Sequence, residues 1–479
     1  MNIPKYLQQA INDITTAGYE AYLVGGCVRD LLMGKTPHDW DITTNAVPEE
    51  ILKIFPQAKY ENDFGTVLYP IREAGSEQVV TVLEITTYRS EQNYSNRRHP
   101  DEVKFETELD KDLERRDFTI NALALEVESK ELVDLFGGEK DIKKKIIRSV
   151  GEPSDRFKED ALRMLRAIRF SAQLGFALEP KTQRAIVKLA GSLKFVSQER
   201  IRDELIKILA SERPYEGIKL LYETKLLQYI LPELIEGVGV KQNHHHIYPV
   251  FKHNLLALKH CPNQEWPVRL AALLHDIAKP RTKQRIKGVD TFYNHEYVGA
   301  KMVAKIMTRL KFSNTDKDRV VNLVRNHMFY YNVGEVSAAS VRRLIAKVGR
   351  ENLQDLIDLR VADRLGSGTP KAMPYKLRHL QYMMAKVQND PVSVKMLKIN
   401  GEDIMKLLQI SPGPKIGALL DVLLAEVIED PALNNSNHLE QRVLELNKLE
   451  LSDLRERARE VIADKQETDD LKIKRSYKV

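Results

Sequence analysis

The chain has 479 residues, too many for one compact core, so we expect two to four domains. A hydrophobic fraction of 43% and a charged fraction of 30% exclude wholesale disorder, and a formal charge of +6 favours acidic partners only weakly. Polar residues occur throughout residues 1–14, so we expect no signal peptide. No apolar run reaches 18 residues, which predicts no membrane span, and two cysteines are too few for a disulfide framework. We therefore expect a protein of the reducing cytoplasm without a membrane partner, and the sequence identifies no protein partner.

Residues 1–140 are predicted to mix helices and strands. Tyr22–Val24 is a short apolar strand, Asp39–Ile42 begins a second extended segment, and Val79–Thr86 is rich in β-branched residues. After about residue 150 the strand signals end and helical periodicity continues to the C-terminus. We expect an α+β fold with a head at 1–140, followed by all-helical parts at 141–225, 226–370 and 371–479.

A glycine turn follows the first predicted strand. Gly25 and Gly26 would let backbone N–H groups approach a triphosphate, and Arg29 could add a charged fork to the same phosphates. A Gly-Gly pair is, however, more often only a tight turn.

Asp39 and Asp41 are predicted to share one face of an extended segment, because residues i and i+2 of a strand point the same way. Two adjacent carboxylates repel each other unless a cation lies between them, and Mg²⁺ with nucleotide phosphates suits such a pair. Two ions held there could activate an attacking hydroxyl and stabilise a departing pyrophosphate. Glu84 is a candidate third carboxylate, although a solvated edge position is equally compatible with the sequence.

The segment 115–121 offers two interpretations. Its polar groups could hold the sugar and phosphates of a nucleotide, or it could be a charged helix start capped by Asp117. The spacing alone does not decide between them.

A helix capped by Ser154 is predicted to run through Arg169, with a buried stripe formed by Phe157, Ala161, Leu165, Ile168 and Ala172. Asp160 and Arg163 could together read a nucleobase. A carboxylate accepts from the amino group of cytosine or adenine while a guanidinium donates to the adjacent ring nitrogen, and uracil and guanine present the opposite pattern. The alternative for this arginine-rich row is a basic exposed face.

Taken together, the motifs resemble the class II tRNA nucleotidyltransferases, which are the bacterial CCA-adding enzymes and their poly(A) polymerase relatives. They occur in order over the first 205 residues: LVGGCVRDLLMG (23–34), the Asp39/Asp41 pair, EITTYR (84–89), RRDFTINAL (115–123), DLFGG (134–138), EDALRMLRAIRF (159–170) and SQERIRDEL (197–205). The resemblance implies a nucleotidyltransferase head with a mixed five-stranded sheet, then a helical neck, an HD-type body and a tRNA-binding tail. It also implies that the ion-binding pair is Asp39 and Asp41, and that the CTP or ATP site comprises Gly26, Arg29, Arg116, Asp160, Arg163, Arg166 and Arg169.

Subtype features favour CCA addition to tRNA but leave alternatives. The stretch 64–69 lacks the basic aromatic segment of poly(A) polymerases, and Ser90–Leu113 is long and polar, unlike the corresponding region of CC-adding relatives. An A-only tRNA nucleotidyltransferase or a poly(A) polymerase remains the alternative.

Histidines and aspartates in the order H…HD…H…H…D resemble the HD phosphohydrolase superfamily. We expect His253, His275, Asp276 and Asp363 to hold one ion, and His295 and His327 to hold a second, with Asp276 bridging. Imidazole ligands suit Ni²⁺, Co²⁺ or Mn²⁺ better than Mg²⁺, and the expected substrate is a 2′,3′-cyclic phosphate. Each histidine taken alone is more often a buried structural residue.

Two hypotheses of other classes remain open. The chain could be a metal-dependent HD phosphohydrolase whose head only recognises a nucleotide or RNA, or a non-catalytic RNA-binding protein. The intact Asp39/Asp41 pair argues against the first, and any metal-dependent turnover would exclude the second.

Overall fold

The computed structural model describes residues 3–61, 65–72, 78–92, 102–242, 247–329, 331–332, 336–369, 373–387 and 390–457. The chain forms two compact units, residues 1–238 with 305–313 (unit 1) and residues 239–304 with 314–479 (unit 2). Every helix in the described ranges is too short or too polar to cross a bilayer. The finer division at residues 140, 225 and 370 stays a prediction.

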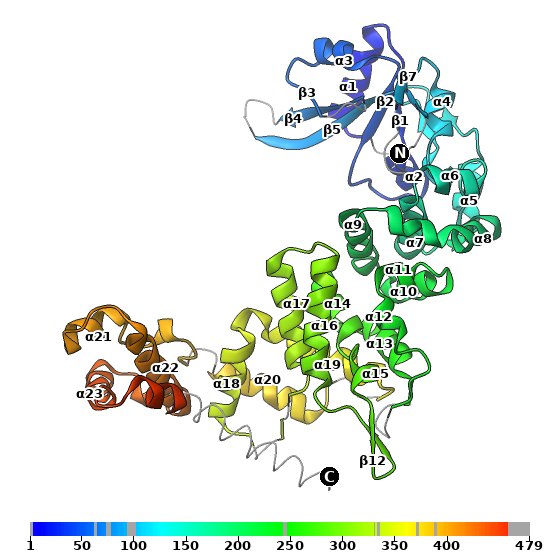
Figure 1. Cartoon of the computed structure of the whole chain (residues 1–479). Coiled ribbons are helices and arrows are strands. Elements are labelled where there is room, and N and C mark those ends of the chain that lie inside the picture. Colours follow the sequence, from blue (N-terminus) through cyan, green and yellow to red (C-terminus); the bar gives the residue numbers. More distant parts are fainter. Residues whose placement is uncertain are drawn as a thin grey trace. The chain divides into compact units, whose positions relative to one another are not determined.

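A seven-stranded mixed sheet forms the centre of the head in unit 1, in the order β3-β4-β5-β2-β1-β8-β9 (Figure 1). Strands β2 and β5 are parallel, and the other neighbouring pairs are antiparallel. The α+β class and the mixed sheet are confirmed, but the sheet has seven strands rather than five, because two-residue strands extend both edges. The strands are β1 (Ala21–Val24), β2 (Asp41–Thr44), β3 (Lys59–Tyr60), β4 (Thr66–Arg72), β5 (Val79–Thr87), β8 (Ala124–Leu125) and β9 (Leu132–Val133).

Short helices and a hairpin complete the head. Helix α1 buries Leu7, Ala10, Ile11 and Ile14, which share one face at helical spacing, and packs against β1 and α3. Part of the long polar segment Ser90–Leu113 forms the β6–β7 hairpin, and its residues 93–101 lie outside the described ranges, as does Phe64. The elements are α1 (Lys5–Thr16), α2 (Gly26–Leu32), α3 (Pro48–Ile54), β6 (Arg89–Gln92), β7 (Glu102–Phe105), α4 (Leu109–Glu114), η1 (Thr119–Asn121), α5 (Gly138–Lys144) and β10 (Ile146–Ile147).

The helix predicted from Ser154 through Arg169 is wrong, because the chain forms two helices there. Helix α6 (Pro153–Glu159) ends at Asp160, whose backbone is extended (φ −136°, ψ 107°), and α7 (Leu162–Leu174) follows. The Asp160 side chain accepts a hydrogen bond from the N–H of Leu162, the first residue of α7, at 3.0 Å, so it lies at the junction of the two helices rather than within one helix. The predicted apolar stripe is buried.

The rest of the unit 1 neck is helical apart from one short strand. Strand β11 pairs with β10 in parallel, so the expectation of helices alone after residue 150 does not hold here. The elements are β11 (Ala177–Leu178), α8 (Pro180–Leu189), η2 (Ala190–Phe195), α9 (Gln198–Leu209), α10 (Pro214–Glu223), α11 (Leu227–Ile230) and α12 (Pro232–Ile235).

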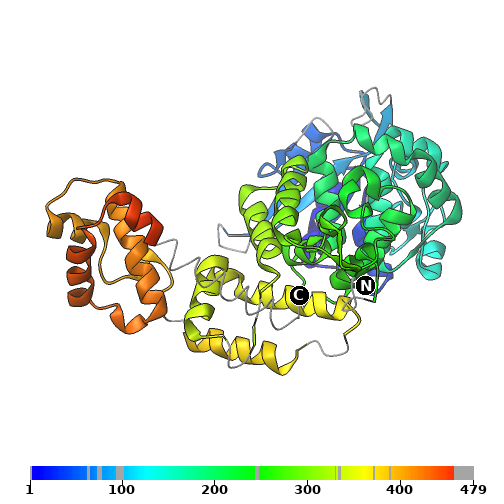
Figure 2. The same ribbon diagram turned by 60° about the horizontal axis from the view of Figure 1, so that its bottom comes forward.

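Unit 2 is built from helices around α13, α14, α17 and α19, with one small hairpin, β12–β13. A Cβ on Gly366 of α19 would lie 2.7 Å from the backbone nitrogen of Ala257 on α13, so this glycine lets the two helices approach closely. Helices α18 and α20 pack side by side (Figures 1 and 2). The elements are α13 (Val250–Lys259), α14 (Trp266–Leu274), α15 (Lys279–Thr282), β12 (Gln284–Ile286), β13 (Val289–Thr291), α16 (His295–Arg309), α17 (Asn314–Asn326), α18 (Ala338–Val348), η3 (Arg350–Asn352), α19 (Leu353–Gly366), α20 (Tyr375–Val387) and η4 (Val394–Met396). The end of α16, from residue 305, is counted with unit 1.

The C-terminal helices have a core of their own. Leu419, Val422 and Leu423 of one helix pack with Leu439 and Val443 of another. These elements, orange to red in Figure 2, are α21 (Gly401–Leu408), α22 (Pro414–Glu429), η5 (Pro431–Leu433) and α23 (Ser436–Leu446).

Candidate active site and candidate metal centre

Two carboxylates of the head sheet and one just before it lie close enough to influence one another's charge. Asp41 begins β2, Asp39 precedes it by two residues, and Glu84 on the parallel strand β5 is in register with Asp41. Since β5 lies between β4 and β2, Glu84 is not on an edge strand, although its side chain is exposed to solvent as that alternative expected. Side chains of paired residues share a face of the sheet, so Asp41 and Glu84 point the same way. Asp39 lies in a bend before β2, not in the extended strand expected for it, and the structure does not place it on that face.

The field among these carboxylates disfavours three negative charges. Burial raises the pKa of Asp41, with Arg116 opposing and Asp39 adding to the increase. Burial, followed by the charge of Asp41, likewise raises the pKa of Glu84. A cation would relieve this repulsion, and carboxylate oxygens are the ligands that Mg²⁺ prefers, so the residues present fit the ion.

The glycine turn brings backbone close to the carboxylates. Gly25 precedes α2 with φ +80°, and a Cβ there would lie 3.0 Å from Arg116 Nη1 and 3.6 Å from Asp41 Oδ2. A side chain would therefore be strained and crowded at this position. Arg29, on the first turns of α2, donates to Asn121 Oδ1 at 2.8 Å and pairs with Asp30.

No α-helix begins in the segment 115–121; the short 3-10 helix η1 begins at Thr119, with Phe118 as its N-cap and no side-chain cap from Asp117. Helix α4 ends at Glu114, and Asp117 accepts from Phe118 N–H and Asn121 Nδ2 through Oδ1 and from Arg166 Nε through Oδ2, the last at 2.6 Å. The interpretation as a capped helix start is thus wrong. The polar groups of the segment instead hold one another near the carboxylates.

Asp112 is a positioning residue that the sequence reasoning missed. Its buried carboxylate accepts two hydrogen bonds from Arg115 and one from Arg116, at 2.7–2.9 Å. Burial opposes ionisation, but the two arginines lower the pKa of Asp112 to about 2. The sequence feature that could have identified Asp112 is its position three and four residues before two arginines, because helical spacing brings such residues together.

In the neck, each residue of the predicted base-reading pair has another partner. Asp160 forms an ion pair with Arg200 at 2.7 Å. Arg163 pairs with Glu159 and donates to the backbone oxygen of Arg115 at 3.2 Å. Base recognition by this pair therefore requires these contacts to be exchanged.

The other two arginines of the row are also paired. Arg166 binds Asp117, and the buried Arg169 donates to Glu204 at 3.0 Å. Arg200 and Glu204 on α9 were missed, although both belong to the motif SQERIRDEL and lie four residues apart on one helix.

Six side chains of unit 2, from five separate places in the sequence, converge in a second cluster. Asp276 Oδ2 lies 3.1 Å from His253 Nε2 and 3.3 Å from His275 Nε2. Asp276 Oδ1 lies 3.2 Å from His295 Nε2 and 3.7 Å from His327 Nε2. The six residues, all with side chains at most 11% exposed, are His253, His275, Asp276, His295, His327 and Asp363.

Local backbone contacts determine which ring nitrogens face the cluster. His275, His295 and His327 donate from Nδ1 to a backbone oxygen three residues earlier, at 2.7–2.8 Å. Each Nε2 therefore carries a lone pair in the neutral ring. The Nε2 atoms of His253 and His275 lie 3.0 Å apart, and those of His295 and His327 lie 3.3 Å apart.

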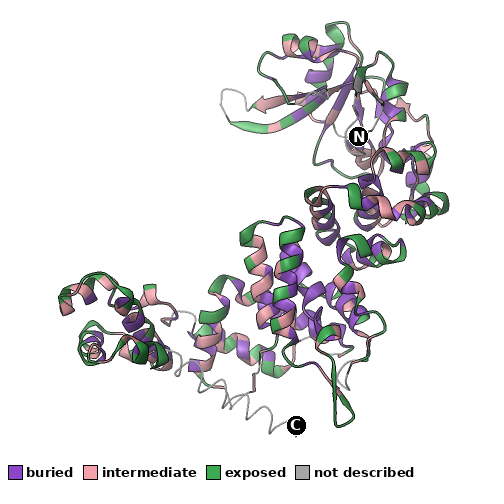
Figure 3. Ribbon diagram, in the orientation of Figure 1, coloured by how far each residue is buried: buried purple, intermediate pink, exposed green. Residues whose placement is uncertain are grey.

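This donor set fits metal ions. Two groups of three ligands share Asp276: one contains His253 and His275, and the other contains His295 and His327. A cation between these lone pairs and carboxylate oxygens would be bound by all of them. The buried helix α14 delivers His275 and Asp276 at its end (Figure 3).

Asp363 belongs with the first group, since its Oδ1 lies 3.3 Å from His253 Nε2. Lys279 and Gln242 were missed: Lys279 Nζ lies 2.6 Å from Asp276 Oδ2 and donates to Gln242 Oε1 at 2.7 Å. Although burial opposes it, Lys279 and then His275 hold the pKa of Asp276 well below its ordinary value. The only sequence signal for Lys279 was its position three residues after Asp276.

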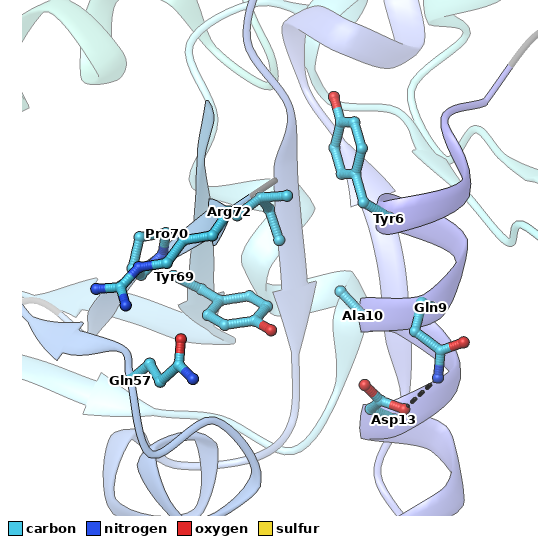
Figure 4. Close-up of a pocket in the computed structure, with 9 residues that line it drawn as sticks. Tyr6, Gln9, Ala10, Asp13, Gln57, Tyr69, Pro70 and Arg72 are labelled. Carbon is cyan, nitrogen blue, oxygen red and sulfur yellow. Dashed lines mark hydrogen bonds between the residues drawn. The ribbon is translucent and has the colours of Figure 1, made fainter. Parts of the chain in front are cut away.

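A cavity of about 280 Å³ on the head does not include any predicted site residue (Figure 4). Its walls come from α1, β4 and the loop at residue 57, and in it Gln9 donates to Asp13 at 2.7 Å. It is distinct from both clusters above.

Three protein-family models match successive parts of the chain. They are described as poly A polymerase head domain (residues 21–148), probable RNA and SrmB-binding site of polymerase A (175–237) and HD domain (256–367). The chain is 36% identical to the A-adding tRNA nucleotidyltransferase of Deinococcus radiodurans over 84% of its own length and 90% of that protein. It is 33% identical to the CCA-adding enzyme of Enterococcus faecalis over 91% of its own length and 95% of that protein.

Solved structures of the same kind are also similar. The Bacillus stearothermophilus CCA-adding enzyme in complex with CTP aligns with a TM-score of 0.69 and 26% identity, over 93% of this chain and 98% of that one.

Proposed function

Since the chain belongs to the class II tRNA nucleotidyltransferase family and is a tRNA nucleotidyltransferase with an HD domain, we propose that it adds C, C and A to the 3′ end of tRNA. CTP and ATP supply the nucleotides, and no nucleic-acid template is used. The observation that carries this proposal is the in-register pair of Asp41 and Glu84 beside the Gly25 turn, with the charge of Asp39 acting on Asp41. Relatives named as A-adding and as CCA-adding both match, so A-only addition is the alternative.

Asp39 and Asp41 would hold Mg²⁺, with Glu84 as the adjacent carboxylate; when bound, the ions would activate the 3′ hydroxyl and stabilise the leaving pyrophosphate. Gly26 backbone, Arg29 and Arg116 would bind the triphosphate. Asp112 orients Arg116 toward this site through the hydrogen bond described above. With Arg116 paired to Asp112 and lying beside Asp41, its charge offsets part of the repulsion among the carboxylates.

Asp160 and Arg163 would select the base. To do so, Asp160 would exchange Arg200 for the amino group of cytosine or adenine, and Arg163 would exchange Glu159 for the ring nitrogen. Uracil or guanine would leave both groups facing the wrong partner, which costs about 1–3 kcal/mol per unsatisfied buried group. Arg166 and Arg169 would stay within their ion pairs and support this surface.

The test is an addition assay on three tRNA transcripts, ending before C, after C and after CC, with labelled CTP and ATP. CCA addition predicts that all three are completed to the same end. Extension of only the transcript ending in CC would establish A-only addition, and a long A tail would establish a poly(A) polymerase.

A second activity is favoured by the convergent lone pairs of the histidine cluster. We propose that the HD domain hydrolyses 2′,3′-cyclic phosphates with Ni²⁺, Co²⁺ or Mn²⁺. His253, His275, Asp276 and Asp363 would hold one ion and His295 and His327 the second; bound ions would supply a hydroxide for attack on phosphorus.

This activity is tested with 2′,3′-cyclic AMP and each metal, for the wild type, His275→Ala and Asp39→Ala. Hydrolysis should disappear in His275→Ala and persist in Asp39→Ala, because the two clusters share no residue. Absence of hydrolysis with every metal would exclude the activity. A cyclic phosphate blocks a 3′ end, so its removal would restore a substrate for nucleotide addition.

A further inference from the structure

Phe170 on α7 has three arginines of the proposed nucleotide site over its ring. The Cζ atom of Arg169 lies 4.4 Å from the ring centroid, that of Arg166 lies 5.5 Å away and that of Arg29 lies 5.6 Å away. At such distances a guanidinium is attracted to the electron-rich face of an aromatic ring. Arg29 belongs to α2 in the head, whereas the other two arginines belong to α7 in the neck. One ring therefore attracts cations from two parts of unit 1.

The three guanidiniums are close enough for their charges to repel one another. Burial lowers the pKa of Arg169, and Glu204 opposes this decrease. The positive charges of Arg166 and Arg29 lower the same pKa further. Each arginine pairs with a different carboxylate, so the ring of Phe170 is a group that all three share. Attraction to the ring offsets part of the repulsion that would otherwise separate the arginines.

The Phe170 ring is itself held in one orientation. It is buried and meets Phe118 edge to face, with the ring centroids 5.8 Å apart and the ring planes at 81°. Phe118 is also buried and follows Asp117, the partner of Arg166. An aliphatic side chain at position 170 would fill much of the same volume but would have no π face for a cation. The aromatic ring of Phe170 therefore acts on the arginines in addition to its packing.

We propose that Phe170 is a positioning residue for the nucleoside triphosphate. Its ring holds Arg29 of the head beside Arg166 and Arg169 of the neck, so that Arg29 is oriented for the phosphates before the ligand binds. This inference rests on the proposed function, which places the triphosphate at Gly26 and Arg29. A cation that is already oriented loses less conformational freedom on binding than a mobile one. The ring therefore contributes to the affinity for the terminal phosphates more than to the affinity for the base.

The experiment compares the equilibrium binding of CTP and of CMP to the full chain. Phe170→Leu and Phe170→Met keep an apolar side chain without a π face. Each should weaken CTP binding about three- to tenfold, which is the range of one cation–π contact, and should lower the ratio of CTP affinity to CMP affinity by the same factor. Phe170→Tyr keeps the π face and should have the wild-type ratio. A general disruption of the site would instead weaken the binding of both ligands equally.

A double-mutant cycle identifies the residue through which the ring acts. In an Arg29→Ala background, Phe170→Leu should no longer change the ratio of CTP affinity to CMP affinity, because the cation that the ring positions is absent. Phe176→Leu is the matched control, since Phe176 is a buried ring of the neck with no arginine over it in the described part of the chain. This control should keep the wild-type ratio.

Nucleotide addition provides the second readout. Phe170→Leu should raise the KM for CTP and for ATP by the same factor as the Kd and leave the kcat unchanged. A wild-type affinity ratio in Phe170→Leu and Phe170→Met would overturn the inference, as would an undiminished effect of Phe170→Leu in the Arg29→Ala background. If CTP binding depended on Phe170 as expected but the wild type added no nucleotide to tRNA, the proposed function would fail and this inference would stand.

Discussion

Replacement of Asp276 should abolish both metal sites at once, whereas replacement of His327 should abolish only one. The reason is that the two carboxylate oxygens of Asp276 face different histidine pairs: Oδ2 faces His253 and His275, and Oδ1 faces His295 and His327. We expect two ions per chain in the wild type, one in His327→Ala and none in Asp276→Ala.

The stability effect follows from linkage. An ion present at about 100 times its Kd stabilises the folded state by about 2.7 kcal/mol. For a unit of this size, each ion lost should lower Tm by roughly 5–10 °C in saturating metal. Removal of the metal from the wild type should lower its Tm by the same amount per ion. The effects of a chelator and of the mutation on Tm should therefore not be additive.

The assay is elemental analysis after dialysis against Ni²⁺ or Mn²⁺, with calorimetric melting of the same samples. Asp421→Ala, an exposed carboxylate on α22, is the matched control and should keep both ions. Retention of two ions by Asp276→Ala would refute the bridging assignment. A wild type that binds a single ion, which His327→Ala still binds, would also refute it.

Three further predictions concern unit 1. Asp41→Asn should reduce nucleotide addition at least about 1,000-fold, by loss of about 4 kcal/mol of transition-state stabilisation. Burial and then Asp39 raise the pKa of Asp41, and Arg116 opposes this increase. Above that pKa the negative charge of Asp41 destabilises the folded state, so Asp41→Asn should have a higher Tm than the wild type at pH 7. Near-normal addition or a lower Tm would contradict this. Asp160→Ala and Arg163→Ala should each lose about 1–3 kcal/mol of discrimination against UTP, measured as relative kcat/KM; unchanged UTP misincorporation would exclude the base-reading role. Asp112→Asn should lower the free energy of unfolding in urea at pH 7 by about 3–5 kcal/mol, because Arg115 and Arg116 lose their buried partner. The pKa of Asp112 is lowered to about 2, so its contribution is present above the ordinary carboxyl pKa and is lost as pH falls toward 2; an equal difference between wild type and variant at pH 2 and pH 7 would refute the assignment.

Local sequence patterns were sufficient for features that depend on neighbours in the chain. The β-branched run at 79–86, the apolar stripe around Leu165 and the ordered motifs up to residue 205 predicted the α+β class, the buried face and the family. The order of histidines and aspartates likewise contained the six residues that the structure brings together, because an HD-type arrangement constrains residue type and order.

Some errors arose where one residue interrupts a regular pattern. Periodicity continues through Asp160, so a single helix was predicted. The backbone of Asp160 is instead extended, and its carboxylate accepts from the first N–H of a second helix. Two-residue edge strands such as β3 and β9 are too short for any periodic signal, which is why five strands were predicted and seven are present.

Tertiary structure alone decided the partners. Glu84 faces Asp41 because β2 and β5 are parallel neighbours, Asp160 meets Arg200 because α9 packs on α7, and Lys279 reaches both Asp276 and Gln242. Spacing along a helix or strand determines which side chains share a face, and that information is local. Which faces then meet depends on packing between segments far apart in the chain, and the pKa values and ion pairs of the site depend on that packing.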